Sequence, residues 1–385
     1  VYWATHGGIL PGEGKNLRYG WSNREDFTYR RRLDTYYVTV PPRKPYAIDL
    51  RLTRSIDVPA TAPDPKETSR IEGVIAGLKK PARGSVRFIE ASDLGDLEYR
   101  RRISTVYQSA LLLSGTVQSN TASGLKFRGV KADEINRRVG YWMEQLHISH
   151  LAKRRSNTLS GGEAQRVSLA RAFCLETELI LMDEPFSALD TPTQQELLGD
   201  LRRIFATTNQ TCVYVTHDLE ESLAIGDRVA VLFNGKLHQL DQVNQVFAHP
   251  DTPEVAAFVG VENIIPGIVQ SASEGLVHIQ SDGASVEAVS DIPPGASVFI
   301  CLRPEDITLC NPGRDSRPNS ARNHLKCRIT QVINQGPLTR IQLECGFPLT
   351  ALVTRPSARE LELAPGKEVI AIFKSSAIHL IKAAE

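Results

Sequence analysis

Apolar and polar positions alternate in two different ways along the chain, and the change falls near residue 260. From Ile71 to about Gly260, continuous apolar runs such as LILM and VAVLF are separated by stretches with helical spacing of apolar residues. Uninterrupted apolar runs are typical of strands buried on both faces, and their alternation with helices predicts a parallel sheet covered by helices. This part is therefore expected to be an α/β domain.

The C-terminal part, residues 261–385, follows a different pattern. Short runs such as SVFICL, KCRITQVI, TRIQLE and EVIAIF are separated by turns that contain Gly and Pro. Short strands at this spacing predict a small antiparallel barrel or sandwich, and two related halves within it are one interpretation of the pattern. Residues 1–70 are rich in Arg, Tyr and Pro and show no sustained period of either kind. The predicted divisions are 1–70, 71–260 and 261–385.

Composition narrows the function classes only slightly. The 385 residues are 41% hydrophobic and 23% charged, with a net charge of +1, so nothing draws the whole chain to nucleic acid and any phosphate chemistry must come from local groups. The six cysteines form no C-x-x-C pair, and several lie in apolar runs, which fits thiols packed as small apolar groups in a reducing compartment. The apolar runs fall far short of a membrane span and residues 1–30 lack a signal pattern, so we expect neither insertion nor export.

The segment LSGGEAQRVSLARAF, residues 159–173, carries the first candidate site. Ser160 can cap a helix, while Gly161 and Gly162 allow backbone N–H groups to approach a ligand closely. The following run is expected to be an amphipathic helix whose N-terminus faces a phosphate. An ordinary capped helix is the alternative interpretation.

Two carboxylates follow the next apolar run, LILMDEP at 179–185. Ligands of parallel sheets gather at the carboxyl ends of the strands, so Asp183 and Glu184 are expected to emerge together there. The first can hold Mg²⁺ and the second can orient or deprotonate an attacking water. A strand followed by a solvated acidic turn is the alternative.

Three further polar residues follow apolar runs. His217, in CVYVTHD at 212–218, would lie near Glu184 if the two strands are neighbours. Asp190 precedes TPTQQELL and is suited to cap a helix. Gln108, in VYQ, can serve as a neutral ligand on the far side of the site, although each of these residues alone has an ordinary structural explanation.

Taken together, the segments VYQ, LSGGEAQR, LILMDEP, SALD and VTHD resemble, in order and spacing, the Q-loop, signature, Walker B, D-loop and switch histidine of ABC transporter ATPases. The resemblance implies a P-loop NTPase-like ATPase domain with a helical insert near residues 108–158, and ATP and Mg²⁺ as cofactors. It places Gln108 and Asp183 at Mg²⁺, Glu184 as the catalytic carboxylate and His217 at the γ-phosphate. It also assigns a group of residues to nucleotide binding, with the first four facing the nucleotide of the opposite subunit: Ser160, Gly161, Gly162, Gln165 and Asp190.

The resemblance further implies partners and a location. Such subunits pair as a homodimer or with another ATPase subunit, sandwich two ATP molecules, and dock through the helical insert on transmembrane permease subunits at the cytoplasmic face of the membrane. An extracytoplasmic oxyanion-binding protein would supply the solute indirectly, and no nucleic acid is involved. A soluble ABC protein of repair or translation is disfavoured because the chain has one ATPase cassette and a β-barrel.

The expected phosphate-binding loop departs from the family pattern. When the family pattern is aligned by counting back from Ile75, the first residue of IAGLKKPARGSV, its phosphate-binding loop falls on residues 62–70. There Ala62, Pro65 and Glu67 replace glycines and Thr68 replaces the lysine. Pro65 lacks a backbone donor and Glu67 brings negative charge, so the loop should bind ATP poorly, with Ser69 left as a weak nucleotide and Mg²⁺ ligand. Two hypotheses stay open: a degenerate subunit that lends its signature helix to an intact partner, or an N-terminal segment read out of its ancestral frame. The breadth of the mismatch favours the second.

The C-terminal part resembles the TOBE or Mop-like, OB-like β-barrel of importer ATPases, closest to the molybdate/tungstate group. The resemblance is carried by CLRPEDITL at 301–309 and by SARN, VTR and FKSS farther on. It points to an oxyanion bound by backbone N–H groups, hydroxyls and a lysine. The residues assigned to it are Ser320, Arg322, Lys374 and Ser375. A purely structural barrel, or an importer for sulfate, iron or polyamines, remains an alternative.

Overall fold

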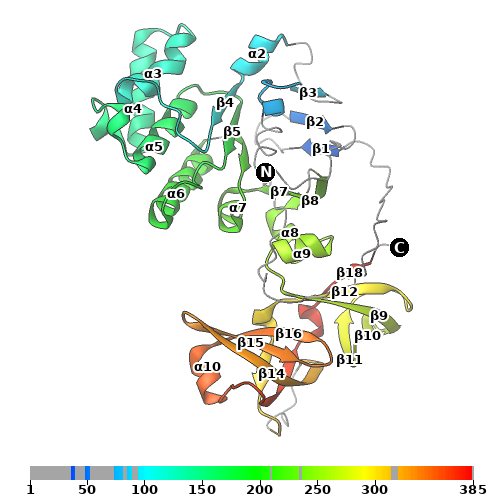
Figure 1. The fold of residues 1–385 in the computed structure, drawn as a ribbon. Coiled ribbons are helices and arrows are strands. Elements are labelled where there is room, and N and C mark those ends of the chain that lie inside the picture. Colours follow the sequence, from blue (N-terminus) through cyan, green and yellow to red (C-terminus); the bar gives the residue numbers. More distant parts are fainter. Residues whose placement is uncertain are drawn as a thin grey trace. The chain divides into compact units, whose positions relative to one another are not determined.

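The computed structural model describes residues 36–39, 48–52, 73–80, 85–88, 94–208, 210–233, 236–313 and 320–383, and the chain divides into two compact units, Val1–Val243 and Asn244–Glu385 (Figure 1). Each unit is described by itself below.

Two short helices that the sequence pattern groups with the α/β part lie at the start of the second unit. Arg303 of the β-rich part donates hydrogen bonds to the carbonyls of Phe247 (3.0 Å) and Val259 (3.3 Å), which attaches the end of each helix to that part.

The first unit is α/β, as the sequence predicts. Its elements are β1 (Tyr36–Thr39), β2 (Ile48–Leu52), β3 (Ser85–Phe88), α2 (Asp96–Arg101), β4 (Ile103–Val106), α3 (Val117–Phe127), α4 (Ala132–Gln145), α5 (Gly161–Phe173), β5 (Leu179–Asp183), α6 (Thr191–Thr207), β6 (Thr211–Val215), α7 (Leu219–Ile225), β7 (Arg228–Phe233) and β8 (Lys236–Gln242). Strands β4, β5 and β6 form a parallel sheet in that order, while β1-β2-β3 and β7-β8 are antiparallel. Two of these strands, β1 and β2, fall within the range 1–70, where the sequence pattern predicted no element.

Strand β5 is central because its side chains are buried on both faces. Leu179, Ile180, Leu181 and Met182 are each at most 1% exposed, and they contribute to two different core clusters, one on each face of the sheet. A strand with apolar side chains on both faces is stable only between two packed layers. The continuous apolar run therefore fixes β5 in the middle of the parallel sheet.

The predicted helical insert is present and packs on the signature helix. Helices α3, α4 and α5 gather beside the parallel sheet in Figure 1, and Trp142 of α4 stacks on Phe173 of α5 with ring centroids 4.8 Å apart. The expectation that α5 is amphipathic is wrong. From Gln165 to Ala170, every residue of this helix is buried, because α3, α4, α6 and the sheet surround it.

The second unit is almost entirely β-structure. Its elements are α8 (Val243–Ala248), α9 (Pro253–Phe258), β9 (Asn263–Ser273), β10 (Leu276–Ser281), β11 (Ala284–Val289), β12 (Ser297–Leu302), β13 (Thr308–Cys310), β14 (Asn323–Gln335), β15 (Leu338–Glu344), β16 (Pro348–Thr354), α10 (Arg355–Glu360), β17 (Glu368–Phe373) and β18 (His379–Lys382). All strand pairs are antiparallel, in the orders β11-β10-β9-β12-β18 and β13-β17-β14-β15-β16.

The two sheets show that this unit consists of two related halves that exchange their last strands. Strand β13 ends the first half yet pairs with β17, and β18 ends the second half yet pairs with β12. A buried asparagine begins each half: Asn263 exchanges two hydrogen bonds with the backbone of Thr350 in the other half, and Asn323 does the same with Glu287. The second half alone carries a helix, α10, before its fourth strand.

The cysteines differ in part from the sequence-based expectation. Cys174 and Cys301 are buried free thiols, and burial raises the pKa of each to about 12, so they pack as apolar groups. Cys327, on β14, and Cys345, directly after the neighbouring strand β15, instead form a disulfide that the expected reducing environment did not suggest. Among the described residues, no helix has both the length and the apolarity needed to cross a bilayer.

Candidate nucleotide site

The parallel sheet brings the predicted carboxylates and histidine to one edge. Strands β4, β5 and β6 run in register, with Val106 opposite Met182 and Asp183 opposite Val215. Gln108 follows β4, Asp183 ends β5, and His217 follows β6. Three segments far apart in the sequence therefore present polar side chains at the carboxyl edge, where open α/β sheets bind ligands.

Glu184 has a strained backbone. Its φ of 40° lies in the left-handed region, which costs a non-glycine residue about 1–3 kcal/mol and is frequent at functional sites. Hydrogen bonds on both sides of the residue hold this backbone conformation. The Glu184 N–H donates to the Val215 carbonyl (2.9 Å), and the Glu184 carbonyl accepts from the N–H and the hydroxyl of Ser187. The carboxylate is thus placed by the sheet and by the following turn.

The side chains of Glu184 and His217 are in contact, as the sequence predicts for neighbouring strands. His217 Nδ1 lies 3.2 Å from Glu184 Oε1, and the two side chains are 47% and 24% exposed. A partly exposed carboxylate that contacts an imidazole can orient water and exchange protons. The pair can therefore serve hydrolysis at this edge.

Ser160 caps the signature helix α5, which begins at Gly161. Its hydroxyl accepts a hydrogen bond from the Glu163 N–H (3.3 Å), and the Glu163 carboxylate accepts one from the Ser160 N–H (2.7 Å). This hydrogen bond lowers the pKa of Glu163. The S-x-x-E spacing of residues 160–163 is the sequence signal of this capping box.

Gly162 has a packing role as well as the predicted ligand role. A Cβ at this position would lie 2.6 Å from Thr193 Cγ2, at the start of α6, whereas a Cβ on Gly161 would meet only ordinary contact. Thr193 cannot move freely because its hydroxyl donates to Asp190 Oδ1 (2.9 Å), and Asp190 caps α6 as predicted. Gly162 therefore allows the signature helix and the D-loop helix of one chain to approach closely.

Gln165 does not lie where the family resemblance places it. The side chain is 2% exposed, and its Nε2 donates to the Tyr107 carbonyl (3.1 Å) of the same chain. In this structure it contacts the residue before Gln108 rather than facing outward toward another subunit. It links the signature helix to the Q-loop backbone.

Sequence reasoning missed a buried polar network behind the histidine. The carboxylate of Glu221, only 3% exposed, accepts hydrogen bonds from the Tyr214 hydroxyl (2.9 Å) and from Gln194 Nε2 (2.7 Å). Gln194 also lies 3.3 Å from Asp218, which follows His217 and caps α7. The network joins α6, β6 and α7, and no local sequence signal marks it because its members lie on three different elements and Gln194 is 24 residues from Asp218 and 27 from Glu221.

The described residues offer a donor set that suits magnesium held together with phosphates. They contain no group of three or more His, Cys, Asp or Glu side chains arranged to hold a metal. Mg²⁺ in phosphoryl-transfer sites usually takes one or two carboxylates plus substrate phosphates and water, which Asp183 and the Gln108 amide oxygen can complement. Ser69 and the predicted loop at 62–70 lie outside the described residues.

The predicted oxyanion residues of the second unit are brought together in part. Asn323 pairs with Phe373, which places Arg322 and Lys374 beside adjacent strand ends. Arg322, however, forms an ion pair with Glu287 and lowers the pKa of that carboxylate. Ser375 is buried, and its hydroxyl has no hydrogen-bond partner in the described part of the chain, whereas Ser320 is exposed.

Comparisons with known proteins agree with this arrangement. The model of the ABC transporter family matches residues 69–187, and the model of the TOBE domain matches residues 319–380. The chain is 39% identical over 310 residues to a molybdate/tungstate import ATP-binding protein of Pyrococcus horikoshii, which covers 80% of this chain and 87% of the relative. The chain therefore belongs to the ABC transporter family, as an importer-type ATP-binding subunit with a C-terminal TOBE domain.

Other relatives carry different solute names. A sulfate/thiosulfate import ATP-binding protein of Thermosynechococcus vestitus is 32% identical over 84% of this chain and 89% of its own length. A spermidine/putrescine import ATP-binding protein of Thermobifida fusca is 37% identical over 69% of each chain. The family is thus shown, while the solute differs among the relatives.

Proposed function

We propose that this chain is the ATP-hydrolysing, energy-coupling subunit of an importer for molybdate or tungstate. The contact between Glu184 and His217 at the edge of the parallel sheet carries the proposal. It supplies the carboxylate and imidazole that hydrolysis needs, and the strained backbone at Glu184 matches a residue held for function.

Each residue of the edge has a separate part in the proposed mechanism. Glu184 orients the attacking water and accepts its proton, while His217 holds the carboxylate and senses the γ-phosphate. Asp183 and Gln108 would hold Mg²⁺, which when bound neutralises charge on the β- and γ-phosphates. Ser160, Gly161 and Gly162 present the N-terminus of α5 to the nucleotide of a second subunit, with Asp190 beside them.

Partners and location follow from this role. The chain would pair with itself or with another ATPase subunit beneath transmembrane permease subunits, at the cytoplasmic face of the membrane. An extracytoplasmic oxyanion-binding protein would deliver the solute to the permease. Helices α3 and α4 of the insert are the proposed docking surface for the permease.

The solute assignment rests on the relatives named for molybdate and tungstate, which are 37–39% identical to this chain. Lys374 and the buried Ser375 hydroxyl are the proposed anion contacts, together with Ser320, and Arg322 would have to leave Glu287 to join them. Sulfate and polyamine importers are the alternative solute classes because relatives with those names also match.

A second candidate function is a catalytically impaired subunit. It is favoured by the sequence of residues 62–70, which lacks the glycines and the lysine of the phosphate-binding loop. Binding and turnover of Mg-ATP by the purified chain separate the two candidates, with Glu184→Gln as the control. Turnover that the substitution abolishes, with ATP binding retained, supports the active enzyme. Absence of ATP binding supports the impaired subunit.

A further inference from the structure

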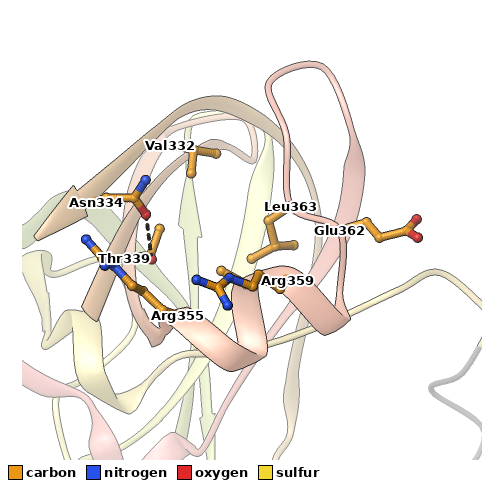
Figure 2. Close-up of a pocket in the computed structure, with 8 residues that line it drawn as sticks. Val332, Asn334, Thr339, Arg355, Arg359, Glu362 and Leu363 are labelled. Carbon is orange, nitrogen blue, oxygen red and sulfur yellow. Dashed lines mark hydrogen bonds between the residues drawn. The ribbon is translucent and has the colours of Figure 1, made fainter. Parts of the chain in front are cut away.

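Helix α10 and the β14–β15 hairpin line a groove in the second unit, and none of the residues assigned to oxyanion binding lines it. The groove has a volume of about 410 Å³ (Figure 2). Its lining includes Val332, Asn334, Thr339, Arg355, Arg359 and Leu363. This volume falls within the range of about 300–1,000 Å³ that is usual for small-molecule sites.

The groove contains two arginines that have no carboxylate partner among the described residues. Arg355 and Arg359 are one helical turn apart, both are exposed, and neither guanidinium forms an ion pair with a residue that the structure describes. The four other arginines described in this unit all form ion pairs with glutamates: Arg303, Arg322, Arg328 and Arg340. The two unpaired guanidinium groups are therefore concentrated at one place.

The strands add a further donor to the groove. Thr339 is 1% exposed, and its hydroxyl hydrogen-bonds to Asn334 Oδ1 (3.1 Å). This bond occupies the amide oxygen and fixes the amide, so that its NH₂ group is the remaining donor. The carboxylate of Glu362, which also borders the groove, points away from Arg355 and Asn334 in Figure 2.

Comparison of the two halves shows that helix α10 is an addition to the second half. In the first half, residues 290–296 join β11 to β12 without a helix, whereas α10 occupies the corresponding place in the second half. The strand order of the two sheets is otherwise equivalent. The pairing of strands is thus complete without the helix that carries both arginines.

We propose that this groove binds a small polar molecule that bears a phosphate group. Guanidinium forks match phosphate oxygens and bind them with charge-assisted hydrogen bonds, and a groove that offers mainly donors selects an anion. A bare tetrahedral anion would leave most of the volume empty, so the phosphate is carried on a larger body that reaches Asn334. The groove shares no residue with the proposed nucleotide site or with the proposed oxyanion residues.

The test is calorimetric titration of the full chain without Mg-ATP, at low ionic strength, with glucose 6-phosphate, inorganic phosphate and glucose as probes. Glucose 6-phosphate should bind more tightly than inorganic phosphate, and glucose should show no binding. Arg355→Gln and Arg359→Gln should each weaken glucose 6-phosphate binding at least tenfold. Arg328→Gln, an exposed arginine of β14 that pairs with Glu368, is the matched control and should not change it.

Three results would overturn the proposal: no binding of glucose 6-phosphate at millimolar concentration, equal binding of inorganic phosphate, or an equal loss in the Arg328→Gln control. Circular dichroism of each variant checks that the β-unit is folded. Because no nucleotide is present, a failure here is distinguishable from a failure of the proposed ATPase function.

Discussion

Tyr214→Phe tests the buried network behind the switch histidine. The substitution removes one hydroxyl and creates no cavity, because the ring of Tyr214 stays in a site that is 4% exposed. The lost hydrogen bond joins the hydroxyl to the Glu221 carboxylate at 2.9 Å, and among the described residues Gln194 then remains as the side-chain donor to this carboxylate. Hydrogen bonds to charged groups contribute about 1.5–3 kcal/mol, so the free energy of unfolding should fall by that amount.

The second arm is a double-mutant cycle. Glu221→Gln makes the acceptor neutral, and in that background Tyr214→Phe should cost only about 0.5–1.5 kcal/mol, which is typical of a neutral hydrogen bond. The coupling energy of about 1 kcal/mol measures the charge on Glu221. Tyr141→Phe, on a tyrosine that is 48% exposed, is the control and should stay within about 0.5 kcal/mol.

Urea unfolding followed by tryptophan fluorescence is the suitable assay. Trp142 belongs to the same core cluster as Tyr214, so its contribution to the fluorescence reports the unfolding of that core. A loss below 0.5 kcal/mol, or the same loss in both backgrounds, would refute the network as a source of stability.

The pH dependence provides an independent check. Burial, with the neighbouring Glu221 carboxylate, raises the pKa of Tyr214 well above its ordinary value. The hydroxyl therefore remains a donor in the folded state, while an unfolded tyrosine ionises near pH 10. The contribution of Tyr214 should be constant below about pH 10 and should be lost as the pH rises further toward the folded-state pKa.

Three further predictions concern packing, a buried charge and buried hydrogen bonds. Gly162→Ala should destabilise the first unit by about 1–3 kcal/mol in urea unfolding because of the Thr193 contact, whereas Gly161→Ala should not; equal effects would contradict the packing role. Asp200→Ala leaves the buried Arg166 with the Leu146 carbonyl and, as its carboxylate among the described residues, Glu196, which is 67% exposed. About 3 kcal/mol should therefore be lost, against less than about 1 kcal/mol for Glu196→Ala. Asn323→Ala removes two hydrogen bonds to the backbone of Glu287 and should lower the stability of the second unit by about 2–3 kcal/mol in calorimetry. An unchanged unfolding transition would contradict a stabilising role for these hydrogen bonds between the two halves.

The sequence determined the elements that depend on local pattern. The apolar run LILM specified β5, the S-G-G start specified the cap of α5, and the order of the short motifs identified the family. The meeting of Glu184 and His217 was also predictable, because parallel strands place their carboxyl ends at one edge of a sheet. These features follow from backbone geometry and from side chains close together in the chain.

Only the tertiary structure decided features that depend on distant neighbours. Gln165 turns inward to the Tyr107 carbonyl, Cys327 of β14 bonds to Cys345 just after β15, and Glu221 contacts Tyr214 and Gln194 on other elements. The burial of α5 on nearly all sides was likewise hidden, because helical periodicity records the apolar face of a helix and not how many elements surround it. The exchange of β13 and β18 between the halves has the same cause: strand patterns fix which face is buried, while the pairing partner is chosen by packing in three dimensions.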